Sequence, residues 1–153
     1  YMMHLMVKHP PIYERCAADH DYCRNVVEET LRMFNPSSAF RVTTQDIEFR
    51  DVLIPAGTML FFNLNVSGRD PAAFGDPDEF RPDRAIDPLT RHVAFGMGKH
   101  MCLGQYIARA QLQEGIHLIA QAMRHPRETG ELGWRPFPGV WGIKGLPIEF
   151  EAA

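Results

Sequence analysis

The stretch Phe95-Gly96-Met97-Gly98-Lys99-His100-Met101-Cys102-Leu103-Gly104 carries the chemistry around which this chain is organised. Gly96 and Gly98, just before the cysteine, permit positive φ angles and a close approach of the backbone. No proline interrupts residues 103–124, so the pattern predicts a long helix there and places Cys102 at its N-terminus. Unpaired N–H groups and the positive end of the helix dipole stabilise an anion at that position. Cys102 is therefore predicted to be a thiolate suited to binding a metal.

Two upstream segments supply charged residues. Residues 19–34 are predicted to form a helix with an aspartate cap, and Glu29 and Arg32 lie three residues apart on it, where they can pair. An isolated surface pair of this kind contributes only roughly 0.2–0.5 kcal/mol. Residues 80–84, Phe-Arg-Pro-Asp-Arg, belong to a proline-rich, charged segment that we expect to be irregular but ordered. On their own, these segments leave the role of the charges open.

Together these segments resemble the cytochrome P450 family. Every fixed position of its haem-ligand signature, F-x-x-G-x-[HR]-x-C-x-G, is filled, by Phe95, Gly98, His100, Cys102 and Gly104. Residues 29–32 match the E-x-x-R element, and residues 80–84 resemble the F-x-P-x-R element. Arg41, at the head of a predicted strand, falls where the family places an arginine. The chain thus resembles the C-terminal half of a P450, closest in appearance to soluble bacterial-type members.

The resemblance implies a role for each residue of the cysteine stretch. Cys102 would bind the iron of haem b, and Phe95 would pack against the thiolate side and keep it dry. Gly98 and Gly104 would leave room for the porphyrin. His100 and Arg41 would donate to the two haem propionates, since buried carboxylates need donors.

The same resemblance implies a structural network and a substrate-facing segment. Glu29, Arg32 and Arg84 would form a buried three-member cluster that locks the irregular segment presenting the cysteine loop. Loss of one member would leave an unpaired buried charge, at a cost of about 3–5 kcal/mol. The residues expected to face substrate are Ser37, Ser38, Ala39 and Phe40.

The expected function is a haem-thiolate monooxygenase, or the C-terminal part of one. A thiolate ligand favours cleavage of the O–O bond of iron-bound dioxygen, and one oxygen atom enters a small hydrophobic organic substrate. Electrons would come from NAD(P)H through a ferredoxin or flavoprotein. Arg91, Lys99 and Arg109 lie near the cysteine loop and are expected either to meet an acidic donor or to form ordinary solvated surface.

Two alternatives of other classes stay open. In the family, a helix above the haem supplies the acidic residue and threonine that deliver protons to dioxygen, and this chain contains no such helix. The chain would then be a catalytically inert truncated fragment, acting as a haem-binding or structural unit. A zinc site formed by His92, His100 and Cys102 is the second alternative, although no second cysteine pair supports it.

The expected fold class is mainly α with a small β region (α+β), as in the C-terminal part of the P450 fold without its N-terminal half and distal helix. Trp134 and Trp141 are expected to be packing anchors. The predicted parts are a helical region 1–35, a β region 36–66, a short helix and irregular meander 67–94, the haem-ligand loop 95–104, the long helix 103–124 and a C-terminal hairpin 134–150.

Composition excludes several other classes of protein. With 153 residues, 45% hydrophobic and 23% charged, the chain has the composition of a globular domain. A net charge of -3 argues against nucleic-acid binding, and no apolar run reaches transmembrane length. Three cysteines form no disulfide framework, which favours a reduced, cytoplasmic setting. The chain opens within an apolar stretch at Tyr1, so we expect it to belong to a longer protein.

Overall fold

A computed structural model of the chain describes residues 1–85, 92–135 and 142–153; Arg91 and Trp141 lie outside these ranges. In chain order the elements are α1 (Met2–Lys8), α2 (Pro10–Ala18), α3 (His20–Met33), β1 (Ser38–Val42), β2 (Ile47–Phe49), β3 (Val52–Ile54), β4 (Met59–Asn63), α4 (Leu64–Ser67), the 3-10 turn η1 (Gly98–His100), α5 (Gln105–Ala122), β5 (Met123–Glu128), β6 (Gly133–Arg135), β7 (Gly142–Gly145) and β8 (Ile148–Ala152). Helices dominate and the strands form small antiparallel pairs, which confirms the expected α+β class.

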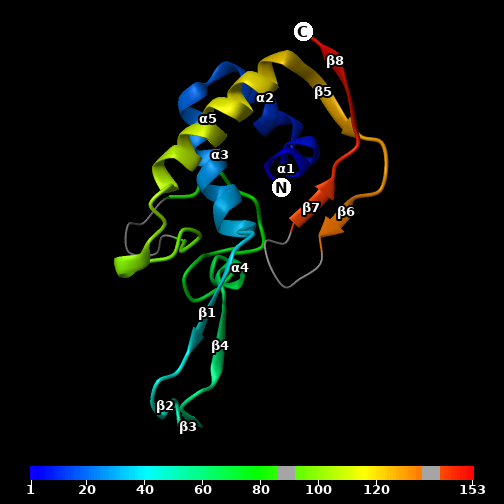
Figure 1. Cartoon of the computed structure of the whole chain (residues 1–153). Helices are drawn as coiled ribbons and strands as arrows, with labels where there is room; N and C mark the ends of the chain where they lie inside the picture. The colour runs from blue at the N-terminus through cyan, green and yellow to red at the C-terminus, as the bar shows by residue number, and fades with distance from the viewer. Residues whose placement is uncertain (86–91, 136–141) are drawn as a thin grey trace.

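The hydrophobic core lies among α1, α2, α3 and α5, which gather at one end of the molecule (Figure 1). Met6, Cys16, Val26 and Ile116 are fully buried there, one from each of these four helices. Burying an Ile or Met side chain contributes roughly 1.5–3 kcal/mol, so this cluster supplies much of the driving force for folding. It fixes α3 against α5. Helix α5 follows the cysteine loop in the chain, and Glu28 of α3 contacts His92 just before the loop.

Two helix starts show how local chemistry sets the boundaries. The Asp19 side chain caps α3 by accepting from the backbone N–H of Tyr22 (3.0 Å), as the sequence predicts. Helix α5 begins at Gln105 with Gly104 as its N-cap, so Cys102 precedes the helix by a short turn. The helix ends at Ala122 rather than residue 124, because Met123 starts β5 and pairs with β8.

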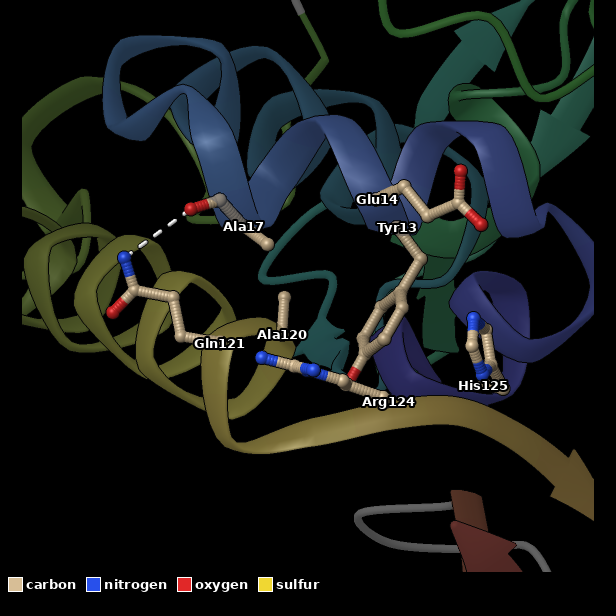
Figure 2. Close-up of a pocket in the computed structure, with 7 residues that line it drawn as sticks. All are labelled: Tyr13, Glu14, Ala17, Ala120, Gln121, Arg124 and His125. Carbon is tan, nitrogen blue, oxygen red and sulfur yellow. Dashed lines mark hydrogen bonds between the residues drawn. The ribbon is translucent and has the colours of Figure 1, made fainter. Parts of the chain in front are cut away.

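The predicted helical region 1–35 is divided at Pro10-Pro11, because proline in the interior of a helix breaks it. These prolines instead occupy the first turn of α2, where the missing N–H groups have no helical partner to lose. Tyr13 on α2 then ties the helix to the end of α5: its hydroxyl lies 2.7 Å from the carbonyl oxygen of Met123 and 3.1 Å from that of Ile119. Figure 2 shows Tyr13 in the wall of a surface hollow of about 450 Å³ between α2 and the start of β5.

The β region forms an arm that extends away from the helices (Figure 1). Strands β1 and β4 pair antiparallel from Ser38↔Asn63 to Val42↔Met59, and β2–β3 forms the tip. Gly57, with φ +81°, makes the turn into β4. Large apolar side chains of this arm are exposed, including Phe49, Leu53 and Met59.

The C-terminal part divides between two strand pairs instead of a single hairpin over 134–150. Strands β6 and β7 pair with each other, whereas β8 pairs with β5. Trp134 stands beside the ring of Tyr1 at 6.2 Å between centroids, and Tyr1 stacks on Phe34. The first and last parts of the chain are thereby packed together. None of the helices formed by the described residues is long and apolar enough to cross a membrane.

Candidate functional site

A large apolar hollow of about 1080 Å³ lies where the β1–β4 arm, α4, the cysteine loop and α5 meet. Apolar side chains such as Leu31, Phe61, Val66 and Leu112 form much of its wall. The sequence-predicted residues that line it are Ser37, Ala39, Arg41, Phe95, His100 and Cys102. Of the residues predicted to bind haem or face substrate, those that do not line it are Ser38, Phe40, Gly98 and Gly104.

The alternation along β1 explains which predicted substrate-facing residues reach this hollow. Ala39 and Arg41 lie two residues apart and both line it, as residues on one face of a strand should. Ser38 and Phe40 do not line the hollow, although the Phe40 ring lies 5.0 Å from the ring of Phe61, which does. Of the four predicted residues, only Ser37 and Ala39 are therefore placed to touch a molecule in the hollow.

The cysteine loop is closed by backbone hydrogen bonds. The Cys102 N–H donates to the carbonyl of Phe95 (2.9 Å), which joins the two ends of the loop. Gly96 and Gly98 have φ of +71° and +74°, so the loop requires glycine-like conformations at both positions. A Cβ on either residue would meet no protein atom within 4 Å, so backbone conformation, not protein crowding, explains these glycines.

Cys102 is the one exposed thiol of the three free cysteines. Cys16 and Cys23 are buried in the helical core, where burial and then the neighbouring Cys23 raise the pKa of Cys16 to about 12. The thiolate is the form of cysteine that binds metal, so Cys102 is the candidate metal ligand of the three. The N–H of Gln105 donates to the Cys102 carbonyl (3.4 Å).

Two basic side chains reach the hollow from different elements, Arg41 from β1 and His100 from η1. Arg41 donates one N–H to the neighbouring Phe40 carbonyl (2.7 Å). Within the described ranges, neither side chain is paired with a carboxylate, so both keep donors for an anionic group. One exposed thiol, an apolar wall and two basic side chains together fit an iron porphyrin with its two propionates.

Outside the lining of the hollow, Glu29 and Arg32 form a buried pair, with side chains only 5% and 2% exposed. Arg32 donates through Nε to Oε2 and through Nη2 to Oε1 of Glu29, both at 2.8 Å. Arg84 Nε and the backbone N–H of Arg81 also donate to Oε1, at 3.4 and 2.9 Å. The structure thus brings the three predicted network residues together around one carboxylate.

The network fastens residues 68–79, which contain no regular helix or strand. Arg32 donates to the carbonyls of Gly68 (2.5 Å), Pro77 (2.7 Å) and Glu79 (3.0 Å). Gly68 approaches so closely that a Cβ there would lie 1.9 Å from the Arg32 carbonyl oxygen. Buried main-chain carbonyls without helical or strand partners are satisfied in this way by arginine N–H groups.

Two contacts of the cysteine loop were missed from the sequence. Asn35, buried at the end of α3, donates to the Ala94 carbonyl (3.1 Å) just before the loop. Glu28 accepts from His92 and Arg109, and the only sequence signal for it is its place beside Glu29. Burial acts to raise the pKa of Glu28, but hydrogen bonds from His92 and Arg109 outweigh it and lower this pKa to about 2.

These contacts bear on two of the predictions. Arg109 is engaged by Glu28 and is not a free surface cation, whereas Lys99 is exposed. His92 also turns its Nε2 to Glu28 (3.0 Å), away from a zinc role. Across the described part of the chain, no three His, Cys, Asp or Glu side chains are grouped to hold a metal ion, so the zinc alternative has no support.

Comparison with known proteins agrees with this geometry. A family model described as Cytochrome P450 matches residues 1–127. The chain belongs to the cytochrome P450 family. Luteothin monooxygenase of Streptomyces thioluteus is 36% identical over 99% of this chain, and the biotin biosynthesis cytochrome P450 of Bacillus subtilis is 32% identical over 95% of it. The chain spans only 37% of the length of each of these relatives.

Solved P450 structures share the fold of the chain. The structure of P450BioI in complex with a fatty-acid-ligated acyl carrier protein superposes with a TM-score of 0.88 at 32% identity, over 98% of this chain and 39% of that one. Cytochrome P450 CYP109Q5 from Chondromyces apiculatus gives a TM-score of 0.89 at 29% identity, over 97% and 38%. The architecture is therefore that of a P450 C-terminal part.

Proposed function

We propose that this chain supplies the cysteine-ligand part of a haem-thiolate monooxygenase that inserts one oxygen atom of O2 into an organic substrate. One observation carries the proposal: Cys102, the exposed thiol, lines the same apolar hollow as Arg41 and His100. Haem b bound there would supply dioxygen activation, and thiolate ligation is what favours O–O cleavage.

The residues of the chain hold this group in separate ways. Cys102 binds the iron through its sulfur, while Arg41 and His100 donate to the propionates. Phe95, which lines the same hollow, would pack against the thiolate side once the haem is bound. Glu29, Arg32 and Arg84 keep the underlying segment in place and take no part in the chemistry.

Substrate and electron donor follow from the character of the surfaces. The hollow is mainly apolar, which suits a small hydrophobic organic substrate, with Ser37 and Ala39 as candidate contacts. Electrons come from NAD(P)H through a ferredoxin or flavoprotein. Lys99 is the exposed cation of the cysteine loop that would meet an acidic donor, and Arg109 is excluded because it is paired with Glu28.

The test separates an enzyme from an inert haem-binding unit. The chain, and the longer protein if the gene encodes one, is loaded with hemin and supplied with a ferredoxin or flavoprotein, NAD(P)H, an apolar organic substrate and ¹⁸O2. Incorporation of one labelled atom into product supports the proposal. Hemin binding without labelled product in either form establishes the alternative, a haem-binding or structural unit. Absence of hemin binding in both forms refutes the haem site itself.

A further inference from the structure

Helix α3 presents two neighbouring carboxylates, and they hold different parts of the molecule. Successive helical residues point about 100° apart, so Glu28 and Glu29 face different surroundings. Glu29 faces the irregular residues 68–84, as described above. Glu28 faces the cysteine loop and α5 and has no contact with that network. The function proposed so far assigns a role to Glu29 and none to Glu28.

Glu28 is the centre of a three-residue cluster formed by segments far apart in sequence. Its Oε1 accepts from Arg109 Nε (2.5 Å), and its Oε2 accepts from Arg109 Nη2 (3.2 Å) and from His92 Nε2 (3.0 Å). The Nδ1 of His92 accepts from the N–H of Ala94 (3.2 Å), so Nε2 carries the proton given to Glu28. With its side chain only 22% exposed, Glu28 is well shielded from water.

Both partners of Glu28 contact the cysteine loop or the residue just before it. The Ala94 N–H donates to Nδ1 of His92, and this hydrogen bond fixes the chain immediately before Phe95. Arg109 lies with its guanidinium 4.6 Å from the centroid of the Phe95 ring and donates to the buried Gln105 side chain (3.0 Å). Phe95 is in turn the residue whose carbonyl accepts the Cys102 N–H.

We propose that Glu28 is a positioning residue for the haem ligand: through His92 and Arg109 it holds the entry and exit of the cysteine loop and so sets where the Cys102 sulfur stands. The assignment of Cys102 as ligand rests on the proposed function, while the control of the loop does not. Glu28 touches neither the sulfur nor the porphyrin site, and it acts only through its two partners.

The geometry explains why a carboxylate is needed. A carboxylate accepts from both N–H groups of a guanidinium and from an imidazole together, whereas an amide oxygen of similar shape accepts fewer bonds and carries no charge. Glu28→Gln therefore keeps the volume of the side chain but removes the charged hydrogen bonds that join it to Arg109 and His92. The matched control is Glu114→Gln. Glu114 lies on α5, the helix that carries Arg109, and its exposed carboxylate is bonded to His20 of α3 (2.8 Å) and not to the loop.

The first measurement is amide hydrogen exchange of residues 92–104 and alkylation of Cys102 in the chain without haem. We expect exchange in this segment to be about 10–100-fold faster in Glu28→Gln, the range for losing one charged hydrogen bond. The alkylation rate of Cys102 in Glu28→Gln should also differ from that in wild type. Glu114→Gln should match wild type in both loop exchange and alkylation rate. Unchanged loop exchange overturns the inference, and so does an acceleration with the denaturant dependence of global unfolding, which would show only general destabilisation.

The second measurement uses the hemin-loaded protein, reduced and treated with carbon monoxide. Glu28→Gln should retain hemin but lose part of the red-shifted Soret band of thiolate ligation.

If Glu28→Gln does not fold, the variant Arg109→Lys provides the test, because lysine keeps the charge but cannot reach Glu28, Gln105 and Phe95 together. We expect faster loop exchange that does not depend on denaturant, and wild-type exchange overturns the inference. If the wild type shows no shifted band, the assignment of Cys102 as ligand fails instead, and loop exchange still tests whether Glu28 holds the loop.

Discussion

Replacing Glu29 with glutamine tests the buried network most sharply. The Glu29 carboxylate accepts from Arg32 twice, from Arg84 and from the Arg81 N–H, at 2.8–3.4 Å. The substitution leaves two guanidiniums, 2% and 15% exposed, without their counter-charge. Removing one partner of a buried pair costs about 3–5 kcal/mol, which is about two to four powers of ten in the folding equilibrium.

Thermal unfolding followed by circular dichroism measures this cost. For a chain of this size, about 2–4 °C is lost per kcal/mol, so the midpoint should fall by about 6–20 °C. The control is Glu149→Gln, which breaks an exposed pair with Arg127 and should cost no more than about 1 kcal/mol. Equal midpoints for the two variants would show that Glu29 does not bind the irregular segment to α3. A folded, haem-replete but inactive Glu29→Gln protein would contradict its structural role.

Two further substitutions address the parts around this network. The folded-state pKa of Glu28, about 2 against the ordinary 4.5, contributes up to about 3 kcal/mol that is present above pH 4.5 and lost as pH falls toward 2. Urea titrations from neutral to acid pH should therefore show Glu28→Gln less stable than wild type at neutral pH, with the difference shrinking on acidification; a constant difference would contradict the shift. Gly68→Ala should cost about 1–3 kcal/mol because its Cβ meets the Arg32 carbonyl at 1.9 Å, whereas Gly75→Ala meets nothing within 4 Å. Equal stability of these two alanine variants in urea would rule out the close contact.

The cysteine stretch and the charged network could be predicted because their signals are local and specific. Five fixed positions within ten residues point to one kind of ligand loop. The spacing of Glu29 and Arg32 places both on one helix face. The aspartate cap at Asp19 likewise sets the start of α3 from neighbouring residues alone.

Other features escaped prediction because they depend on segments that are distant in sequence. Proline both ends and begins helices, so the predicted helical region 1–35 gave no sign that a second helix begins at Pro10. Met123 continues the apolar pattern of α5, yet pairing with Ala152 turns it into a strand. The partners of Glu28 lie 64 and 81 residues away, and no short motif records such contacts.

The central claim is that the Cys102 sulfur binds haem iron, and the reduced, carbon-monoxide-treated spectrum tests it most directly. The hemin-loaded protein should show the red-shifted Soret band of thiolate ligation, and Cys102→Ser should lose it while Cys16→Ser keeps it. An unshifted band in the wild type, or a shifted band that survives in Cys102→Ser, would contradict the account.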